Sequence, residues 1–353
     1  MKAAFSTRKG ILAALMALTC AISLSACAGK SDVISPKGTK PFTVMLDWFP
    51  NADHAALYAA IAHGYFREAG LDVNVVTPAE TAEPLELLAA DKADVAISYE
   101  PEVLLARDQG LKLVSIAALV QRPLTSVIAL PSKHVNSLAG LAGKTVGTAG
   151  LNYQAAELGT VLRHAGVKRS SVQEVTVGFN LVPAMLSGKV AATLGGFWNY
   201  EALQLQLMGK HPIVIPVDQA GVPSYNELVL VVRQEEAQRD GQDLRAFLAA
   251  LTRGETAVKQ DPQAATQLIL KANSDLQAKL QLESIKRTLP AAYPADTSEP
   301  YGYQDPQAWA SFSRWMFAEH LLHNNPESRP QPFTNEFLPG QGLGKKSEEA
   351  EGF

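Results

Sequence analysis

The sequence is poor in cysteine. Among its 353 residues only Cys20 and Cys27 are cysteines, and both lie in the first 27 positions. The rest of the chain therefore has no thiol that could form a disulfide, bind a metal as a thiolate or act as a nucleophile. These three kinds of chemistry are excluded for the body of the protein.

The sequence also lacks a large excess of charge and the common catalytic motifs. Its formal net charge is -4 at pH 7, which gives no basic footprint for a nucleic acid. It contains no G-x-S-x-G, no H-E-x-x-H, no G-x-x-x-x-G-K-S/T and no G-x-G-x-x-G after a predicted strand. We therefore expect a protein without catalytic residues, metal ligands or a cofactor, and without a nucleic-acid partner.

Long hydrophobic runs are missing except near the N-terminus. There, basic residues at the start of the chain precede an apolar run from Ile11 to Ile22, which is short for a bilayer span of about 20 residues. This pattern is typical of a secretion signal, which takes no part in the fold. No later stretch contains about 18 uninterrupted apolar residues, so we expect no other membrane-spanning helix.

The end of this segment resembles a bacterial lipobox, because small residues precede the cysteine in Leu24-Ser25-Ala26-Cys27. We expect residues 1–27 to be a lipoprotein signal peptide and Cys27 to be lipidated. Residues 28–40 would then tether the protein to an envelope membrane, facing the periplasm or the cell exterior. The alternative is an ordinary signal peptide cut near Ala26 or Ala28.

The body of the chain alternates short apolar strands with helices, which is typical of an α/β protein. A first series of strands is predicted at residues 42–46, 72–76, 93–98, 111–120 and 126–130. A composition break at residues 131–136 precedes a second series, with helices at 153–164 and 181–186 and strands ending near 146, 177 and 194. One more strand, at 227–232, and four helices complete the pattern.

We therefore predict a two-lobed α/β protein with a hinge, a ligand cleft between the lobes and extra C-terminal helices. Residues 41–132 and 233–340 are expected to form the first lobe and residues 133–232 the second. The C-terminal helices should pack on the first lobe, and residues 341–353 should be a disordered tail.

Candidate ligand contacts gather where the first predicted strand ends. Trp48, Asn51 and His54 follow this strand and precede a helix, the position at which open α/β sheets collect ligands. An indole face can stack on a planar ring, while the amide and the imidazole direct hydrogen bonds to its edge. The alternative is that Trp48 belongs to the core and Asn51 only caps the helix.

Other strand ends repeat this mixture of aromatic and polar residues. Tyr99 and Glu100 follow a strand of the first lobe, and Trp198, Tyr200 and Glu201 follow one of the second lobe. Glu201 is the best acidic candidate, because a carboxylate can accept hydrogen bonds from an exocyclic amine or a ring N–H. It could instead be a solvated glutamate favoured by the helix dipole.

Four further residues lie at predicted loop edges. Asn152 and Tyr153 begin a helix, where backbone N–H groups could receive a polar or anionic group. Asn180 and Tyr225 follow or precede strands and could line the cleft. Their stretches could equally be plain turns.

The segment Asp47-Trp48-Phe49-Pro50-Asn51-Ala52-Asp53-His54 resembles the D-W-x-P-N-x-x-H segment of solute-binding proteins that handle pyrimidine precursors of thiamine. These proteins belong to the NMT1/THI5-like group of ABC-transporter components. Gly64-Tyr65-Phe66, Ser98-Tyr99-Glu100-Pro101 and Gly196-Phe197-Trp198-Asn199-Tyr200-Glu201 support the resemblance, which covers roughly residues 41–322.

The resemblance implies the type II periplasmic binding protein fold and a formylaminopyrimidine-like ligand, a small heterocycle. It also implies delivery of this ligand to an ABC permease driven by a separate ATPase; we expect a monomer. Relatives bind riboflavin, sulfonates, nitrate or other aromatic solutes, so these ligands are alternatives. Eukaryotic members synthesise the pyrimidine and carry a cysteine-rich segment, which residues 195–201 lack; an enzyme with a reactive His54 is the other alternative.

Overall fold

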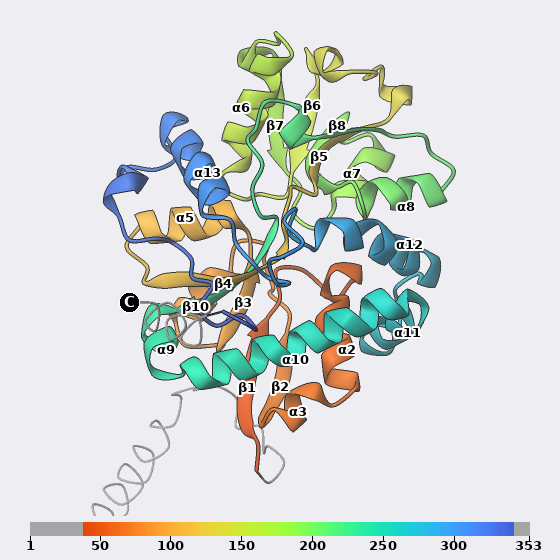
Figure 1. The fold of residues 1–353 in the computed structure, drawn as a ribbon. Coiled ribbons are helices and arrows are strands. Elements are labelled where there is room, and N and C mark those ends of the chain that lie inside the picture. Colours follow the sequence, from red (N-terminus) through yellow and green to blue (C-terminus); the bar gives the residue numbers. More distant parts are fainter. Residues whose placement is uncertain (1–37, 342–353) are drawn as a thin grey trace, which may run out of the picture. The chain divides into compact units, whose positions relative to one another are not determined.

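The computed structural model describes residues 38–341 (Figure 1). The predicted signal peptide with Cys27, nearly all of the predicted tether and nearly all of the predicted tail lie outside the described residues. Two five-stranded sheets form the framework, as expected for two α/β lobes. No helix within residues 38–341 is both long enough and apolar enough to cross a membrane.

The first sheet has the strand order β2-β1-β3-β10-β4. Strand β1 is parallel to β2 and β3, whereas β10 is antiparallel to both β3 and β4. The strands are β1 (Lys40–Met45), β2 (Leu71–Val76), β3 (Val95–Ser98), β4 (Leu113–Val120) and β10 (Leu228–Arg233). Because β10 runs in the opposite direction, its first residues lie at the edge where β1 and β3 end.

The second sheet has the analogous order β7-β6-β8-β5-β9, in which β5 is antiparallel to both of its neighbours. Its strands are β5 (Thr125–Ala129), β6 (Thr145–Thr148), β7 (Gln173–Thr176), β8 (Ala192–Phe197) and β9 (Ile213–Pro216). The second sheet is thus built from one continuous part of the chain, residues 125–216, whereas the first sheet combines residues 40–120 with β10.

This arrangement corrects two predicted lobe assignments. Residues 126–130 were expected in the first lobe, but β5 lies between β8 and β9 in the second sheet. Residues 227–232 were expected in the second lobe, but β10 lies between β3 and β4 in the first. The chain crosses between the lobes before β5, at residues 121–124, and not at the composition break after residue 130. Strand β9 was not predicted, because its four residues are only partly buried, Pro212 precedes it and Pro216 is its last residue.

The helices cover both sheets. Those that follow strands of the first sheet are α2 (Ala55–Ala62), α3 (Tyr65–Glu68), α4 (Pro84–Ala89) and α5 (Glu100–Asp108). Those of the second are α6 (Gln154–His164), α7 (Leu181–Ser187) and α8 (Glu201–Leu207). After β10 come α9 (Gln234–Arg239), α10 (Gly241–Gln260), α11 (Pro262–Ala272), α12 (Ala278–Thr288) and α13 (Pro306–Ala318). Short 3-10 helices include η1 (Ala52–His54), which precedes α2.

The C-terminal helices pack on the first lobe as predicted. Helix α10 packs against α2 and α3, α11 contacts α2, and α13 contacts α5 (Figure 1). Helix α12 has a second role, because it contacts η1 of the first lobe and also α8 of the second. It therefore forms part of the boundary between the lobes.

The contact of α10 with α2 depends on Gly254. A Cβ atom at this position would collide with the carbonyl oxygen of Ala56 and lie 2.8 Å from the Cβ of Ala60. Gly254→Ala is therefore expected to lower the free energy of unfolding by about 1 to 3 kcal/mol, although alanine favours helices. At Gly159 in α6 a Cβ meets only Arg163 Nη1, at 3.8 Å, so Gly159→Ala should stabilise by up to about 1 kcal/mol. Urea unfolding of both variants measures the difference; a stabilising Gly254→Ala would contradict the close approach.

Candidate functional site

A cavity lies between the lobes, at the carboxyl ends of β1, β3, β6 and β8. The first lobe supplies Asp47, Trp48, Asn51, Asp53 and Tyr99; the second supplies Ala149, Leu151, Tyr153, Gln154, Leu181, Gly195, Phe197, Tyr200 and Glu201; Thr125 and Glu227 come from the segments that cross between the lobes.

The loop after β1 is fixed by a buried polar network. Asp47 is 3% exposed; its Oδ2 accepts a hydrogen bond from the Tyr99 hydroxyl at 2.7 Å, and its Oδ1 lies 2.9 Å from His54 Nε2. The backbone N–H of Asn51 donates to His54 Nδ1 at 3.2 Å. Nδ1 is therefore an acceptor, and the N–H at Nε2 donates a hydrogen bond to Asp47 Oδ1. The network holds Trp48 and Asn51 at the cavity wall.

Asn51 also caps η1, which the sequence suggested as the alternative to ligand contact. Its Oδ1 accepts from the backbone N–H of Asp53 at 2.8 Å, and its Nδ2 donates to the Phe49 carbonyl. The same residue lines the cavity. The two interpretations are therefore compatible.

Aromatic rings lie in and beside the cavity wall. Trp48 of the first lobe meets Phe179 of the second edge to face, with ring centroids 4.3 Å apart, and Phe49 lies 6.3 Å from the same ring. Tyr99 and Tyr153 are buried in the wall. Such surfaces suit a flat ring, and their contact across the lobes indicates a closed form.

The ionisable groups of the lining are mostly carboxyls, and no lysine or arginine is among them. Burial raises the pKa of Asp53 to about 6 and those of Glu201 and Glu227 to about 7. A ligand that brings N–H groups or positive charge would stabilise the ionised carboxylates. An anionic ligand would be repelled by these carboxylates.

Glu227 has a second function, because it connects the two crossing segments. Glu227 directly precedes β10. Its Oε2 accepts from the backbone N–H groups of Leu124 (2.6 Å) and Thr125 (2.7 Å), and its Oε1 accepts from the Thr125 hydroxyl at 2.9 Å. The carboxylate thus joins the hinge to the cavity wall.

Six predicted site residues line the cavity: Trp48, Asn51, Tyr99, Tyr153, Tyr200 and Glu201. The last of these accepts a hydrogen bond from the Phe197 backbone N–H at 2.8 Å through Oε2. The strand-end argument therefore brings together residues of both lobes.

The structure keeps the other predicted residues out of the lining. Both ring nitrogens of His54 are engaged within the protein. Glu100 is fully buried, where its Oε2 accepts from Asn226 N and Nδ2, and burial raises its pKa to about 8. Trp198 donates from Nε1 to the Pro123 carbonyl at 2.9 Å in the hinge.

The remaining three predicted residues are also outside the cavity wall. Asn152 and Asn180 are exposed at the surface before α6 and α7. Tyr225 is buried and packs against Phe312 of α13, with ring centroids 4.7 Å apart. Asn152 and Asn180 therefore face solvent, and packing against α13 holds Tyr225 away from the cavity, although each of the three is close in sequence to residues that line it.

Sequence reasoning missed several lining residues. Asp47 and Asp53 stand next to predicted contacts, so the strand-end rule could have found them. Glu227 begins a strand whose reversed direction was not predicted. Gln154 is buried, and its Oε1 accepts from the backbone N–H groups of Gly150 and Leu151 just before α6, a local capping contact that was not predicted.

The cavity lacks two common catalytic nucleophiles in its lining. It contains no cysteine or serine in its lining, and His54 lies behind the wall. Within residues 38–341 no group of three or more histidine, cysteine, aspartate or glutamate side chains could hold a metal ion.

Comparisons with known proteins agree with this geometry. A family model described as "NMT1/THI5 like" matches residues 51–265. The formylaminopyrimidine-binding protein of Halalkalibacterium halodurans is 34% identical over 314 residues, which cover 87% of this chain and 94% of the relative. The 4-amino-5-hydroxymethyl-2-methylpyrimidine phosphate synthase of Legionella pneumophila is 24% identical over 251 residues, covering 70% of this chain and 78% of the relative.

The fold is that of the periplasmic binding proteins, as predicted. The alkanesulfonate-binding protein SsuA from Xanthomonas axonopodis pv. citri, solved with bound MOPS, superimposes with a TM-score of 0.64. The match has 16% sequence identity and covers 81% of this chain and 95% of that protein. At this identity the similarity concerns the fold alone.

Proposed function

Because the chain belongs to the NMT1/THI5-like family, we propose that it is a solute-binding protein whose ligand is a formylaminopyrimidine-like precursor of thiamine. The ligand occupies the cavity between the lobes. A relative that is 34% identical carries the name of a formylaminopyrimidine-binding protein, which supports this choice.

One observation carries the proposal: the lining combines aromatic rings with carboxyls and has neither lysine nor arginine. Trp48 covers the flat face of the ligand, and Glu201 accepts a hydrogen bond from its amine or ring N–H. The sulfonate and nitrate alternatives fit less well, because an anion would enter among carboxyls without a cationic partner.

Lobe closure is the mechanism. Ligand contacts from both lobes exist together only in the closed form, so binding shifts the population toward that form. An ABC permease with its ATPase recognises the closed form and receives the ligand. A lipid on Cys27, outside the described residues, tethers the monomeric protein to the membrane on its periplasmic or external side.

The enzymatic alternative has the support of the synthase relative. It required His54 as a reactive residue, yet both nitrogens of this ring are engaged in hydrogen bonds and the ring does not line the cavity. Incubation of the pure protein with an aminopyrimidine tests this directly, because turnover or covalent change at His54 would contradict the binding function.

A thermal-shift screen with pyrimidines, flavins, sulfonates and nitrate tests the ligand class. A ligand at 100 times its Kd stabilises the folded protein by about 2.7 kcal/mol, so a pyrimidine should give the largest shift. If a flavin or a sulfonate stabilises the protein and no pyrimidine does, the proposed ligand is wrong. A bound flavin would also colour the purified protein yellow.

Trp48→Ala is expected to weaken binding of the pyrimidine by about 10- to 100-fold, because stacking of a base on an aromatic side chain contributes about 1 to 3 kcal/mol. Calorimetric titration measures the affinity. Phe317→Ala is the control, since Phe317 is an aromatic residue of α13 that is 40% exposed and outside the cavity. Equal affinity of Trp48→Ala and the unaltered protein would refute the stacking role.

A further inference from the structure

Three side chains form a polar contact between the lobes beside the cavity. Asn199, in the loop after β8, is fully buried; its Nδ2 donates to Asp53 Oδ1 at 2.7 Å and to Thr288 Oγ1 at 2.6 Å. The Thr288 hydroxyl, on α12, lies 3.1 Å from the same Asp53 oxygen. We call Asp53, Asn199 and Thr288 the clasp.

The clasp depends on closure of the lobes. Asn199 belongs to the second lobe, whereas Asp53 lies in η1 and Thr288 ends α12, both on the first-lobe side. A rotation that opens the cleft would separate Asn199 from its two partners. The clasp therefore stabilises the closed form in particular.

The two oxygens of Asp53 have different surroundings. Oδ1 is engaged in the clasp, whereas Oδ2 is buried and has no hydrogen-bond partner among residues 38–341. Asp53 lines the ligand cavity together with Trp48 and Glu201. Burial raises its pKa to about 6 although Asn199 and Thr288 donate to Oδ1, and Oδ2 has no donor that would compensate for its burial. A ligand N–H could supply that donor.

We infer that Asp53 couples ligand recognition to lobe closure: Oδ2 accepts an N–H of the bound heterocycle while Asn199 and Thr288 hold Oδ1 across the lobes. The inference rests on the proposed function, since it requires an N–H donor in the cavity. Asn199 is a positioning residue that orients Asp53 without touching the ligand. Ligand and clasp then stabilise the same closed form, so each strengthens the other.

Three variants distinguish the roles of the two carboxyl oxygens of Asp53. Asn199→Ala and Thr288→Val remove donors to Oδ1. Asp53→Asn retains an oxygen that can accept from Asn199, but it places an NH₂ group where Oδ2 was. The matched control is Gln206→Ala, which removes a hydrogen bond to Arg287 at another, exposed contact between α8 and α12.

The probe is the aminopyrimidine 4-amino-5-hydroxymethyl-2-methylpyrimidine, the compound whose phosphate the synthase relative makes. For Asn199→Ala we expect a larger radius of gyration without ligand, by small-angle scattering, and ligand dissociation faster by about 10- to 100-fold. Thr288→Val should change both quantities in the same direction. Gln206→Ala should change dissociation by less than about twofold.

Asp53→Asn should behave differently. Its radius of gyration without ligand should match that of the unaltered protein, because the clasp retains its acceptor. Its affinity for the aminopyrimidine should fall by at least about tenfold, since two donors would face each other. The analogue that carries hydrogen in place of the amine should bind to both proteins with similar affinity.

The outcomes distinguish the inference from the proposed function. If the unaltered protein binds no aminopyrimidine, the proposed function fails, and the ligand role of Asp53 fails with it. If it binds, but Asn199→Ala lowers only the melting temperature and leaves dissociation and the radius of gyration unchanged, Asn199 is merely structural and the inference is overturned. If Asp53→Asn lost affinity equally for the aminopyrimidine and for the analogue without the amine, the inference would also be overturned.

Discussion

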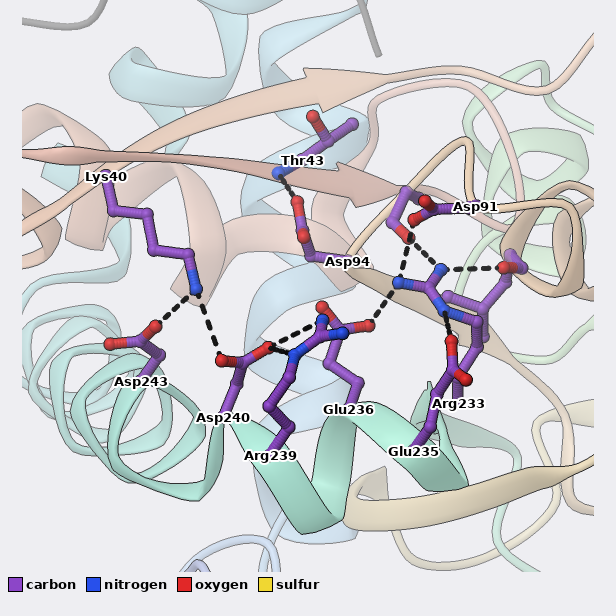
Figure 2. A network of polar contacts seen from close by, with 12 residues as sticks. Lys40, Thr43, Asp91, Asp94, Arg233, Glu235, Glu236, Arg239, Asp240 and Asp243 are labelled. Atoms are coloured by element: carbon purple, nitrogen blue, oxygen red, sulfur yellow. Dashed lines mark hydrogen bonds and ion pairs between the residues drawn. The ribbon is translucent and has the colours of Figure 1, made fainter. Parts of the chain in front are cut away.

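Arg233→Met is expected to lower the free energy of unfolding by about 3 to 5 kcal/mol, because removal of one member of a buried ion pair leaves charge and hydrogen-bonding groups without compensation. Arg233 ends β10 and is 7% exposed. Its Nη2 lies 2.6 Å from Glu236, which is itself 3% exposed, and 2.9 Å from Asp91. Figure 2 shows the guanidinium at the centre of this network.

The same guanidinium also donates to the backbone. Arg233 Nη1 donates to the carbonyl oxygens of Leu88 and Ala93 at 2.9 and 2.8 Å, which fixes the turn between α4 and β3. Methionine fills a similar volume but donates no hydrogen bond. The substitution therefore removes several polar contacts while it leaves little empty space.

A neighbouring arginine provides the control. Arg239 is exposed and pairs with Asp240 at 3.0 Å in the same view (Figure 2). Arg239→Met should change the free energy of unfolding by less than about 1 kcal/mol, as is usual for surface ion pairs. Urea unfolding measures both variants. If Arg233→Met and Arg239→Met lowered the free energy of unfolding by similar amounts, burial would not determine the contribution of Arg233.

Arg233→Met should leave ligand affinity unchanged in the protein that remains folded. Glu227, directly before β10, lines the cavity. Strand β10 runs away from this edge of the sheet, so Arg233 at its end lies at the opposite edge. Calorimetric titration at a temperature well below the unfolding transition separates this stability effect from binding.

Local patterns in the sequence predicted most helices and strands of the fold, but they did not predict to which sheet β5 and β10 belong. The alternation around Val127 and the apolar run from Leu228 to Val232 correctly indicate strands. Which sheet they join depends on pairing with residues distant in the sequence, such as Thr193 beside Ile128. Periodicity within a segment carries no information about such a partner.

The candidate site was predictable to the extent that it follows strand ends. Trp48, Tyr99 and Glu201 occupy such ends and line the cavity. Glu100 and Trp198 satisfy the same rule, yet hydrogen bonds with the Asn226 amide and the Pro123 carbonyl engage them elsewhere. A strand end specifies the neighbourhood of a residue, whereas the direction of its side chain depends on tertiary partners.

The acidic lining leads to the prediction with the largest effect on binding. The phosphate ester of 4-amino-5-hydroxymethyl-2-methylpyrimidine should bind at least about 1,000-fold more weakly than the free alcohol, since like charges in a buried site cost several kcal/mol. Within the lining, Asp47, Asp53, Glu201 and Glu227 carry carboxyl groups, and no lysine or arginine opposes them. Competitive titration against the alcohol measures the ratio of affinities.

The ratio should also depend on pH. Burial raises the pKa of both Glu201 and Glu227 to about 7, so these groups lose their protons as the pH rises from 6 to 8. The cavity then becomes more negative, and discrimination against the anionic ester should increase by up to about tenfold for each carboxyl that titrates. The sulfate ester is the control, because its charge does not change in this range, whereas the phosphate itself titrates near pH 6.

Glu201→Gln tests whether the carboxyl itself discriminates. The amide preserves the shape of the side chain but removes one negative charge, so the preference for the alcohol over the sulfate ester should fall by about tenfold at pH 8 and much less at pH 6. Unchanged discrimination in this variant would assign the effect to steric exclusion. Tighter binding of the phosphate ester than of the alcohol would contradict the proposed ligand class, because a binding site for the product of the synthase relatives would require cationic groups that the cavity lacks.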